Sequence, residues 1–365
     1  MKFYTNIQLI GNQFLIRGYE NGQHVTHREE WKPTLFVPSR KKTKYKTLEG
    51  ESVEPIQPGF VRDCREFYKK YDEVENFKIY GNDRYVYQYI SEKYPQDRIE
   101  FDIKKIKLVT IDIEVAAEQG FPDVENVAEE LLLISLQDYA TKKVTTFGSR
   151  NFVNKDPNVT YILCRDEVHL LSSFLAYWRK NLPEVITGWN SQMYDIPYLA
   201  GRINRVMGEK SMKDLSPWGL VSQGEVYISG RKNITYDIGG VTQLDYLDLY
   251  KRFTYTNQES YRLDYIANYE LGEKKLDHNE YDTFREFYTK DWDKFVRYNI
   301  KDVQLVDRLE DKLKLIELAV TMAFDAKVNF IDIHYQVRMW DTIIYNYLKK
   351  RNIVIPPKKR TSKSQ

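Results

Sequence analysis

The residues KLVTIDIEV, at positions 107–115, alternate between apolar and polar side chains in the manner of a β-strand. The odd-numbered positions from 109 to 115 carry valine or isoleucine, whereas Asp112 and Glu114 fall at even-numbered positions. Because successive strand side chains point to opposite faces, the two carboxyl groups share one face. A solvated polar face is the simpler interpretation of such a pair. In a low-dielectric surrounding, two adjacent carboxylates require a proton or a cation, and a divalent metal bound by oxygen ligands meets that need.

The first 100 residues contain short alternating runs that predict a small α+β unit. Asn21-Gly22 is a strong signal for a tight turn between two of these runs. No cluster of residues suited to catalysis is visible in this region. Strands are predicted over residues 2–11, 12–22, 25–31 and 33–39, and a helix over residues 61–72.

From residue 107 onward the pattern changes to strands that alternate with helices. The apolar residues of 166–181 recur at the i, i+3, i+4, i+7 spacing of a helix with one buried face. A helix over 194–208 tolerates Pro197 only in its first turn. Strands are further predicted over 130–138, 143–148, 160–164, 184–190 and 241–249, a β-ribbon over 224–240, and helices near 261–270 and over 290–316. The predicted fold class is therefore α/β, a mixed sheet flanked by helices, with an α+β N-terminal domain.

The composition is that of a soluble globular protein. Of the 365 residues, 42% are hydrophobic and 30% are charged, and no apolar run of 18 residues is present to span a membrane. The N-terminus lacks the apolar core and cleavage site of a secretory signal. Cys64 and Cys164 are too far apart for a disulfide framework or a metal-binding pair, and they fit a reducing cytosol.

The net charge of +2 is too small to indicate nucleic-acid binding by itself. Basic residues are nevertheless clustered in SRKKTKYK at 39–46 and in the C-terminal KKRTSKSQ. Both clusters could bind phosphates, and a solvated loop and a disordered end explain them as well.

Acidic residues far along the chain occupy positions from which they could join the acidic strand. Asp195 follows a strand at the entry to a helix, where a helix N-cap is the simpler role. Tyr298 and Asp302 are four residues apart and so share one face of a helix, which by itself indicates an exposed face. Asp307 and Glu310, further along that helix, are expected to be solvated.

Together these positions form a three-part pattern. It consists of Asp-x-Glu on the first strand, Asn-x-x-x-Tyr-Asp about 80 residues on, and Tyr-x-x-x-Asp about 100 residues beyond that. This is the signature of the DEDD 3′–5′ exonucleases. The stretches TIDIEV, TGWNSQMYDIPYLAGRI, GEKSMKDLSPWG, QLDYLDLYKRF and YNIKDV, in this order, closely resemble the N-terminal and proofreading domains of the family B DNA polymerases of T4-like bacteriophages. The likeness covers nearly the whole chain and implies a ribonuclease H-like exonuclease fold.

The resemblance implies hydrolysis of the 3′-terminal phosphodiester bond with two divalent ions. Mg²⁺ is the expected cofactor, and Mn²⁺ should substitute for it. Asp112 would bridge both metals, and Asp195 would hold one of them, partly through water. Glu114 and Asp302 would bind the metal on the nucleophile side. Tyr298 would orient the attacking water, because no histidine lies near Asp302 in the sequence, as the sister subclass requires.

The implied substrate is single-stranded DNA or a frayed primer 3′ end. In relatives a ribbon like that at 224–240 guides the unpaired strand, so Asn190, Arg231 and Lys232 are expected to contact DNA. An ordinary exposed hairpin is the alternative. The implied domains are an N-terminal domain of residues 1–104, completed by 317–365, and an exonuclease domain of residues 105–316. No stacking motif establishes RNA binding by the N-terminal domain.

The chain departs from the family at its C-terminal end, where no polymerase palm motif follows IVIPPKKRTSKSQ. Polymerase activity is therefore not expected from this chain alone. The chain is either a truncated piece or the natural first half of a split polymerase with a palm-bearing partner chain. Its polar ending favours the split polymerase. We expect an active 3′–5′ DNA exonuclease in the cytoplasm of a phage-infected cell. The alternative is a non-catalytic DNA-binding and assembly module that is inactive without its partner.

Overall fold

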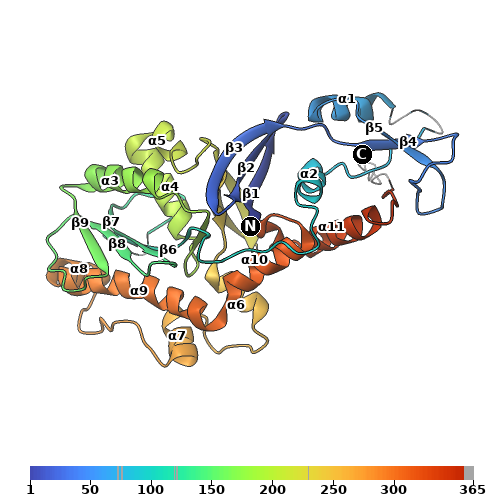
Figure 1. Ribbon diagram of the computed structural model, residues 1–365. Coiled ribbons are helices and arrows are strands. Elements are labelled where there is room, and N and C mark those ends of the chain that lie inside the picture. The colour runs from blue at the N-terminus through green and yellow to red at the C-terminus, as the bar shows by residue number, and fades with distance from the viewer. Residues whose placement is uncertain (72–73, 75–76, 119, 121, 229, 357–365) are drawn as a thin grey trace. The chain divides into compact units, whose positions relative to one another are not determined.

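The computed structural model describes residues 1–71, 74, 77–118, 120, 122–228 and 230–356 (Figure 1). The chain is grouped into two compact units, one of Met1–Phe101 with Ala319–Gln365 and one of Asp102–Leu318. The predicted domain bounds, residues 1–104 completed by 317–365 and residues 105–316, stay a prediction. Among the described residues, no helix has the length and apolar character needed to cross a membrane. The predicted basic tail, from residue 358 on, lies outside the described residues.

The unit of Met1–Phe101 and Ala319–Gln365 contains a three-stranded antiparallel meander. Asn21 and Gly22 both have positive φ and connect two of its strands, which confirms the predicted tight turn. The elements are β1 (Lys2–Ile10), β2 (Gln13–Glu20), β3 (Gln23–Glu30), β4 (Leu35–Pro38), β5 (Val53–Ile56), α1 (Val61–Tyr71), α2 (Tyr85–Lys93), the 3₁₀ helix η1 (Phe330–His334) and α11 (Gln336–Lys349). The helix α10 (Leu315–Ala326) leads into this unit from the other one.

Residues that return after position 318 complete the core of this unit. The Tyr4 hydroxyl donates to the carbonyl oxygen of Val328 at 2.6 Å. The Asn329 side chain accepts from the Ile7 N–H at 2.9 Å and donates to the Ile7 carbonyl at 2.8 Å, as a neighbouring strand would. The ring of Phe324 packs edge-on against that of Tyr4, with 5.1 Å between the centroids. The meander therefore depends on residues more than 300 positions away for its packing.

The unit of Asp102–Leu318 is built on a six-stranded sheet with the strand order β13-β10-β6-β7-β8-β9. The sheet is mixed, because β6 is parallel to β10 and antiparallel to β7. This confirms the predicted fold class. The elements are β6 (Leu108–Val115), β7 (Leu131–Asp138), β8 (Val144–Gly148), β9 (Val159–Leu163), α3 (Glu167–Lys180), β10 (Val185–Thr187), α4 (Asp195–Met207), α5 (Glu209–Lys213), β11 (Val221–Ile228), β12 (Arg231–Ile238), β13 (Thr242–Gln243), α6 (Tyr246–Phe253), α7 (Leu263–Leu271), α8 (Phe284–Lys290) and α9 (Trp292–Leu313).

Helices cover both faces of this sheet, with α3 and α4 on one face and α9 on the other (Figure 1). The aliphatic residues at odd positions of β6 lie in one core with Phe174 and Trp178 of α3 and Ile196 of α4. A second core contains Phe295 and Val303 of α9 together with residues of β7 and β8. Because strand side chains alternate, the even positions of β6 face α9.

Several predicted elements were wrong in extent; the strand predicted over 184–190, for example, covers only Val185–Thr187. The strand predicted over 241–249 ends at Gln243, because the Asp245 side chain accepts from the Leu247 N–H and caps α6. The single helix predicted over 290–316 is two helices, because Lys314 has a φ of 57° and interrupts the helical hydrogen bonds.

The expectation that Asp307 and Glu310 are solvated was also wrong, since they are only 3% and 2% exposed. Asp307 forms an ion pair with the Lys142 ammonium at 2.8 Å. Glu310 accepts from the backbone N–H groups of Ile316 and Glu317 at 3.0 and 3.1 Å, and so caps the start of α10. Both carboxylates are structural, because each satisfies charged or polar groups that burial would otherwise leave unpaired.

Candidate active site

The face of β6 that carries acids lies opposite α9. The odd positions of the strand are buried against α3 and α4, so Asp112 and Glu114 point to the other side. From α9 come Tyr298, Asn299 and Asp302, which lie within about one helical turn of one another. The register of β6 against β7 shifts directly after Glu114, and such irregularities re-aim side chains near functional sites.

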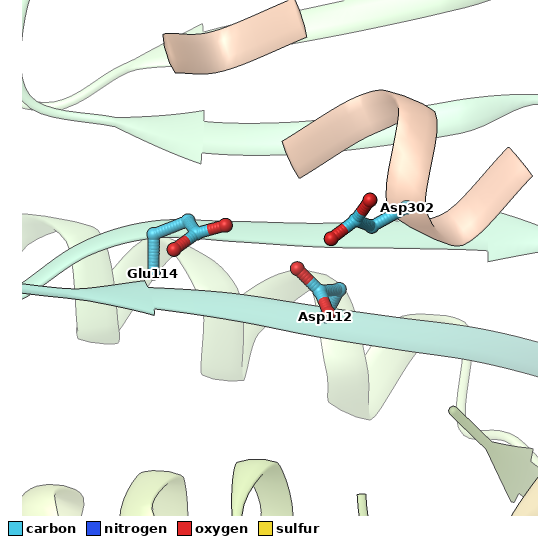
Figure 2. A group of neighbouring side chains, drawn as sticks. All are labelled: Asp112, Glu114 and Asp302. Carbon is cyan, nitrogen blue, oxygen red and sulfur yellow. The ribbon is translucent and has the colours of Figure 1, made fainter. Parts of the chain in front are cut away.

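Three carboxyl groups meet in the space between β6 and α9. Figure 2 shows Asp112 and Glu114, from the strand, turned toward Asp302 on the helix. One oxygen atom of each lies within 4.8 Å of the others. Glu114 and Asp302 are 8% and 3% exposed, and Asp112 is partly buried. The Oδ1 atom of Asp302 is buried and accepts no hydrogen bond from the described residues.

This arrangement strongly disfavours ionisation of the acids in the protein alone. Burial, followed by the charge of Asp302, raises the pKa of both Asp112 and Glu114 well above the usual range. Burial also raises the pKa of Asp302 itself, although the nearby Lys275 ammonium opposes this. Close carboxylates with raised pKa values gain from a cation that replaces their protons. The all-oxygen donor set and the unpartnered Asp302 oxygen fit a hard divalent ion.

Asp195 lies beside this group without belonging to it. It is the first residue of α4 and not its N-cap, which is Tyr194, so the helix-cap alternative was wrong. One of its carboxyl oxygens accepts from the backbone N–H of Ile113, midway between the two acids of β6, at 3.0 Å. Burial raises the pKa of Asp195 to about 7. The cluster of three oxygens within 4.8 Å does not include it, but it lines the same cleft.

The turn that precedes Asp195 is held by a buried acid, the N-cap residue of α6. Asn190 has a φ of 66°, in the left-handed region that non-glycine residues rarely adopt. The Asp245 carboxylate accepts from the N–H of Asn190 at 3.1 Å and from that of Gln192 at 3.0 Å. Burial raises the pKa of Asp245 to about 6, although its hydrogen bonds favour the ionised form. Asp245 therefore maintains the turn that positions Asn190 and Asp195.

A lysine from the loop between α7 and α8 enters the acid cluster. The Lys275 ammonium forms an ion pair with Asp302 and lies 3.5 Å from the hydroxyl oxygen of Tyr298. Burial by itself would lower the pKa of Lys275, but the charge of Asp302 raises it. Burial raises the pKa of the Tyr298 hydroxyl, which therefore stays protonated. His278, though distant in sequence, has its ring 5.5 Å from the Tyr298 ring.

The acids line a cleft of about 1730 Å³. The exposed Arg231 and Lys232, at the start of β12, line it together with Asn190. Lys232 forms an ion pair with Glu225 across the β11–β12 ribbon at 2.8 Å. The apolar lining of the cleft includes Trp189, Met193, Ile228 and Phe284. The residues predicted to contact DNA and the acids thus line one cleft, and the ribbon tip at residue 229 lies outside the described residues.

Three residues of this site were not among those predicted from the sequence. Asn299 is the one polar residue in the buried series 292, 295, 296, 299 and 303 of α9, and that interruption was a usable signal. Asp245 precedes a short amphipathic run, which is a signal for a helix cap. Lys275 belongs to the loop sequence GEKKLDH, whose neighbouring lysine is equally basic, so no sequence pattern distinguishes it.

The class of this domain follows from a comparison with protein families. The model for the DNA polymerase family B exonuclease domain matches residues 69–266. The chain therefore belongs to this family. The match includes the acidic strand and the entry to α4, and it ends before α9, so the family model does not cover Tyr298 and Asp302.

The DNA polymerases of two bacteriophages are similar to this chain over nearly its whole length. It is 30% identical to the DNA-directed DNA polymerase of Escherichia phage RB69 and 29% identical to that of Enterobacteria phage T4. Each match covers 97% of this chain and 42% of the relative. The DNA polymerase of Bombyx mori nuclear polyhedrosis virus is 28% identical over 44% of this chain and 16% of its own length. The chain thus spans less than half the length of the phage relatives that it matches.

Proposed function

We propose that this chain is a divalent-metal-dependent 3′–5′ exonuclease that removes nucleotides from single-stranded DNA or from a frayed primer end. The observation that carries this proposal is the meeting of Asp112, Glu114 and Asp302 within 4.8 Å, in a cleft lined by Asp195. Membership in the exonuclease-domain family supports it. The chain would act in the cytoplasm of a phage-infected cell.

The acids are proposed to hold two Mg²⁺ ions, with Mn²⁺ as a substitute. Asp112 would bind both ions, Glu114 and Asp302 the ion on the nucleophile side, and Asp195 the other, partly through water. Once bound, the ions would lower the pKa of a water molecule and offset the charge that builds on the phosphate. The Ile113 N–H supports the role of Asp195, because it holds one carboxyl oxygen and leaves the second for an ion.

Two further side chains are proposed to act on the phosphodiester. Tyr298 keeps its proton because burial raises the pKa of its hydroxyl, so it can hold the attacking water by a hydrogen bond. Lys275 lies beside both Tyr298 and Asp302 and carries the positive charge that a scissile phosphate requires. Its ammonium would contact the phosphate when cations take over the neutralisation of Asp302.

The cleft suits an unpaired strand. Trp189 and Phe284 offer aromatic surfaces on which bases can stack. Arg231 and Lys232 supply positive charge for the phosphates from the ribbon, and Asn190 supplies an amide. We therefore propose that the ribbon guides the 3′ strand toward the acids.

The purified chain, incubated with Mg²⁺ and a 3′-labelled single-stranded oligonucleotide, tests the proposed activity. Wild type should release labelled mononucleotide, and EDTA should abolish the release. Asp302→Ala should lose nearly all turnover, about 10³-fold or more, because it removes a charged ligand. Tyr298→Phe should keep a measurable fraction, because it removes one hydrogen bond. Asp311→Ala, half-exposed on the same helix, is the matched control. Equal rates for wild type and Asp302→Ala would refute the assignment.

A specific feature of α11 favours a second candidate function, that of an assembly module. Val337, Trp340, Ile344 and Tyr347 follow one face of this helix at the i, i+3, i+7, i+10 spacing, and each is at least half exposed. Exposed apolar faces of this kind indicate a binding surface. The phage relatives are DNA polymerases of which this chain covers 42%. We propose that a palm-bearing polypeptide, which corresponds to the part of the phage relatives outside the match, binds this face.

Co-elution with a palm-bearing polypeptide tests the second function. The probe is the portion of the RB69 phage polymerase that this chain does not match. Trp340→Lys combined with Ile344→Lys should abolish co-elution and primer extension by the mixture. Leu48→Lys, which replaces another exposed apolar residue of the same unit, should change neither. Undiminished co-elution of the double variant would exclude the α11 face as the contact.

A further inference from the structure

Asn299 lies between the acids and the body of α9, and it has no solvent exposure. Its side-chain amide nitrogen donates to Oδ2 of Asp112 at 2.7 Å. Its amide also favours the ionised form of Glu114 and so lowers the pKa of that acid, against the larger effect of burial. The hydrogen bond links α9 to Asp112, which lies almost 190 positions earlier in the chain.

This position is unfavourable for a polar residue on stability grounds alone. The neighbours of Asn299 on the buried face of α9 are Phe295, Val296 and Val303, all in an apolar core. The Asn299 Oδ1 atom is buried and accepts no hydrogen bond from the described residues. A buried, unpaired acceptor costs about 1–3 kcal/mol, which a leucine of similar shape would avoid. The carboxamide therefore has a role that an apolar side chain does not supply.

The direction of the amide indicates this role. With its N–H group toward Asp112, the amide engages a negative oxygen and leaves its own oxygen on the apolar side. The reversed amide would place an oxygen against a carboxylate. A carboxylate that accepts a hydrogen bond at one oxygen has a fixed plane, so its second oxygen keeps one direction. The Ile113 N–H holds Asp195 in the same manner.

We propose that Asn299 is a positioning residue that fixes the orientation of Asp112 and thereby sets the affinity of the site for divalent metal. It acts through Asp112 and does not touch the substrate. The inference rests on the proposed metal-dependent function. Partners of metal-binding carboxylates typically change metal affinity about 10- to 100-fold when they are removed. We expect an effect of this size for Asn299.

The test compares wild type, Asn299→Leu and Asn299→Ser in two assays. Mn²⁺ binding is measured directly from the loss of the free-ion electron paramagnetic resonance signal. Cleavage of a labelled single strand is measured as a function of Mn²⁺ concentration. Asn299→Leu should raise the Kd for Mn²⁺ about 10-fold or more, and high Mn²⁺ should restore its maximal rate. Asn299→Ser, which keeps one O–H donor, should lie between the two. Gln304→Leu, which replaces a half-buried amide on the same helix, should match wild type.

The outcomes separate this inference from the function on which it rests. Wild type that neither binds Mn²⁺ nor cleaves DNA would overturn the proposed function and the positioning role with it. Wild type that does both, while Asn299→Leu binds Mn²⁺ within twofold of wild type, would overturn the positioning role alone. A maximal rate that stays low at saturating Mn²⁺, with unchanged Kd, would also overturn it, because it indicates general disruption. If Asn299→Leu fails to fold, the same criteria apply to Asn299→Ser.

Discussion

Replacing Asp195 by asparagine should stabilise the metal-free protein at alkaline pH. Asp195 is 4% exposed, and burial raises its pKa from the usual 3.8 to about 7. A carboxyl group whose pKa is higher in the folded state stabilises the fold while it is protonated, and this contribution is lost as the pH rises through the folded pKa. The difference corresponds to a free-energy cost on the order of 4 kcal/mol for ionised Asp195 at pH 8. Asparagine is nearly isosteric, carries no charge and keeps the oxygen that accepts from Ile113.

The assay is urea unfolding in EDTA, followed by tryptophan fluorescence. Four of the six tryptophans, Trp178, Trp189, Trp218 and Trp292, lie in the unit that contains Asp195, so the signal reports mainly on that unit. At pH 8, Asp195→Asn should raise the free energy of unfolding by up to about 4 kcal/mol. At pH 5 the gain in the free energy of unfolding should fall below about 2 kcal/mol, because most of the free-energy cost of ionising Asp195 develops above that pH.

Added Mg²⁺ should make wild type more stable than Asp195→Asn, or at least reduce the difference between their free energies of unfolding. An ion that binds only the folded state stabilises it by mass action, and wild type has the ligand that the variant lacks. Asp156→Asn, at an exposed loop position, is the control and should change stability by less than about 0.5 kcal/mol at both pH values. A variant less stable than wild type in EDTA at pH 8, or an equal gain at pH 5 and pH 8, would refute the electrostatic reasoning.

Two other substitutions distinguish the roles of residues around the acids. Lys275→Met should tighten Mn²⁺ binding, because the ammonium no longer neutralises Asp302. The same substitution should lower the maximal cleavage rate about 10²-fold, because the phosphate loses a positive partner. Electron paramagnetic resonance titration with Mn²⁺ measures the first effect, and single-turnover cleavage measures the second. Lys274→Met, at an exposed position, is the control. A cleavage rate of Lys275→Met equal to that of wild type would contradict the role of Lys275. Asp245→Ala should lower the free energy of unfolding by about 2–4 kcal/mol, because three backbone N–H groups lose their acceptor, and cleavage should slow as the turn at Asn190 relaxes. Urea unfolding measures the first effect, and a loss no greater than that of Asp248→Ala would show that the capped turn contributes little.

Local periodicity was sufficient to predict the elements that carry the proposed ligands. The alternation of KLVTIDIEV predicted that Asp112 and Glu114 share one face of a strand, and they do. The spacing of Tyr298 and Asp302 predicted a shared helical face, and both line the acidic cleft from α9. These predictions succeeded because the side-chain directions in strands and helices follow from backbone geometry over a few residues.

Other predictions failed where a distant group decided the outcome. The cap that Asp245 forms on α6 had a local signal, but its bonds to a turn more than 50 positions earlier had none. Asp307 and Glu310 have the spacing of solvated helical residues, but Lys142 and the start of α10 bury them. No local pattern contains such partners.

The sequence by itself determined where the acidic residues lie along the chain, which of them share a face of a strand or helix, and the mixed α/β class of the fold. Only the tertiary structure decided that Asp112, Glu114 and Asp302 meet within 4.8 Å. It also decided that Asn299 donates to Asp112 and that Lys275 rather than Lys274 enters the cluster. The physical reason is that periodicity specifies a direction relative to the local backbone. Burial, charge coupling and hydrogen bonding depend on which segments the packing of the core brings together.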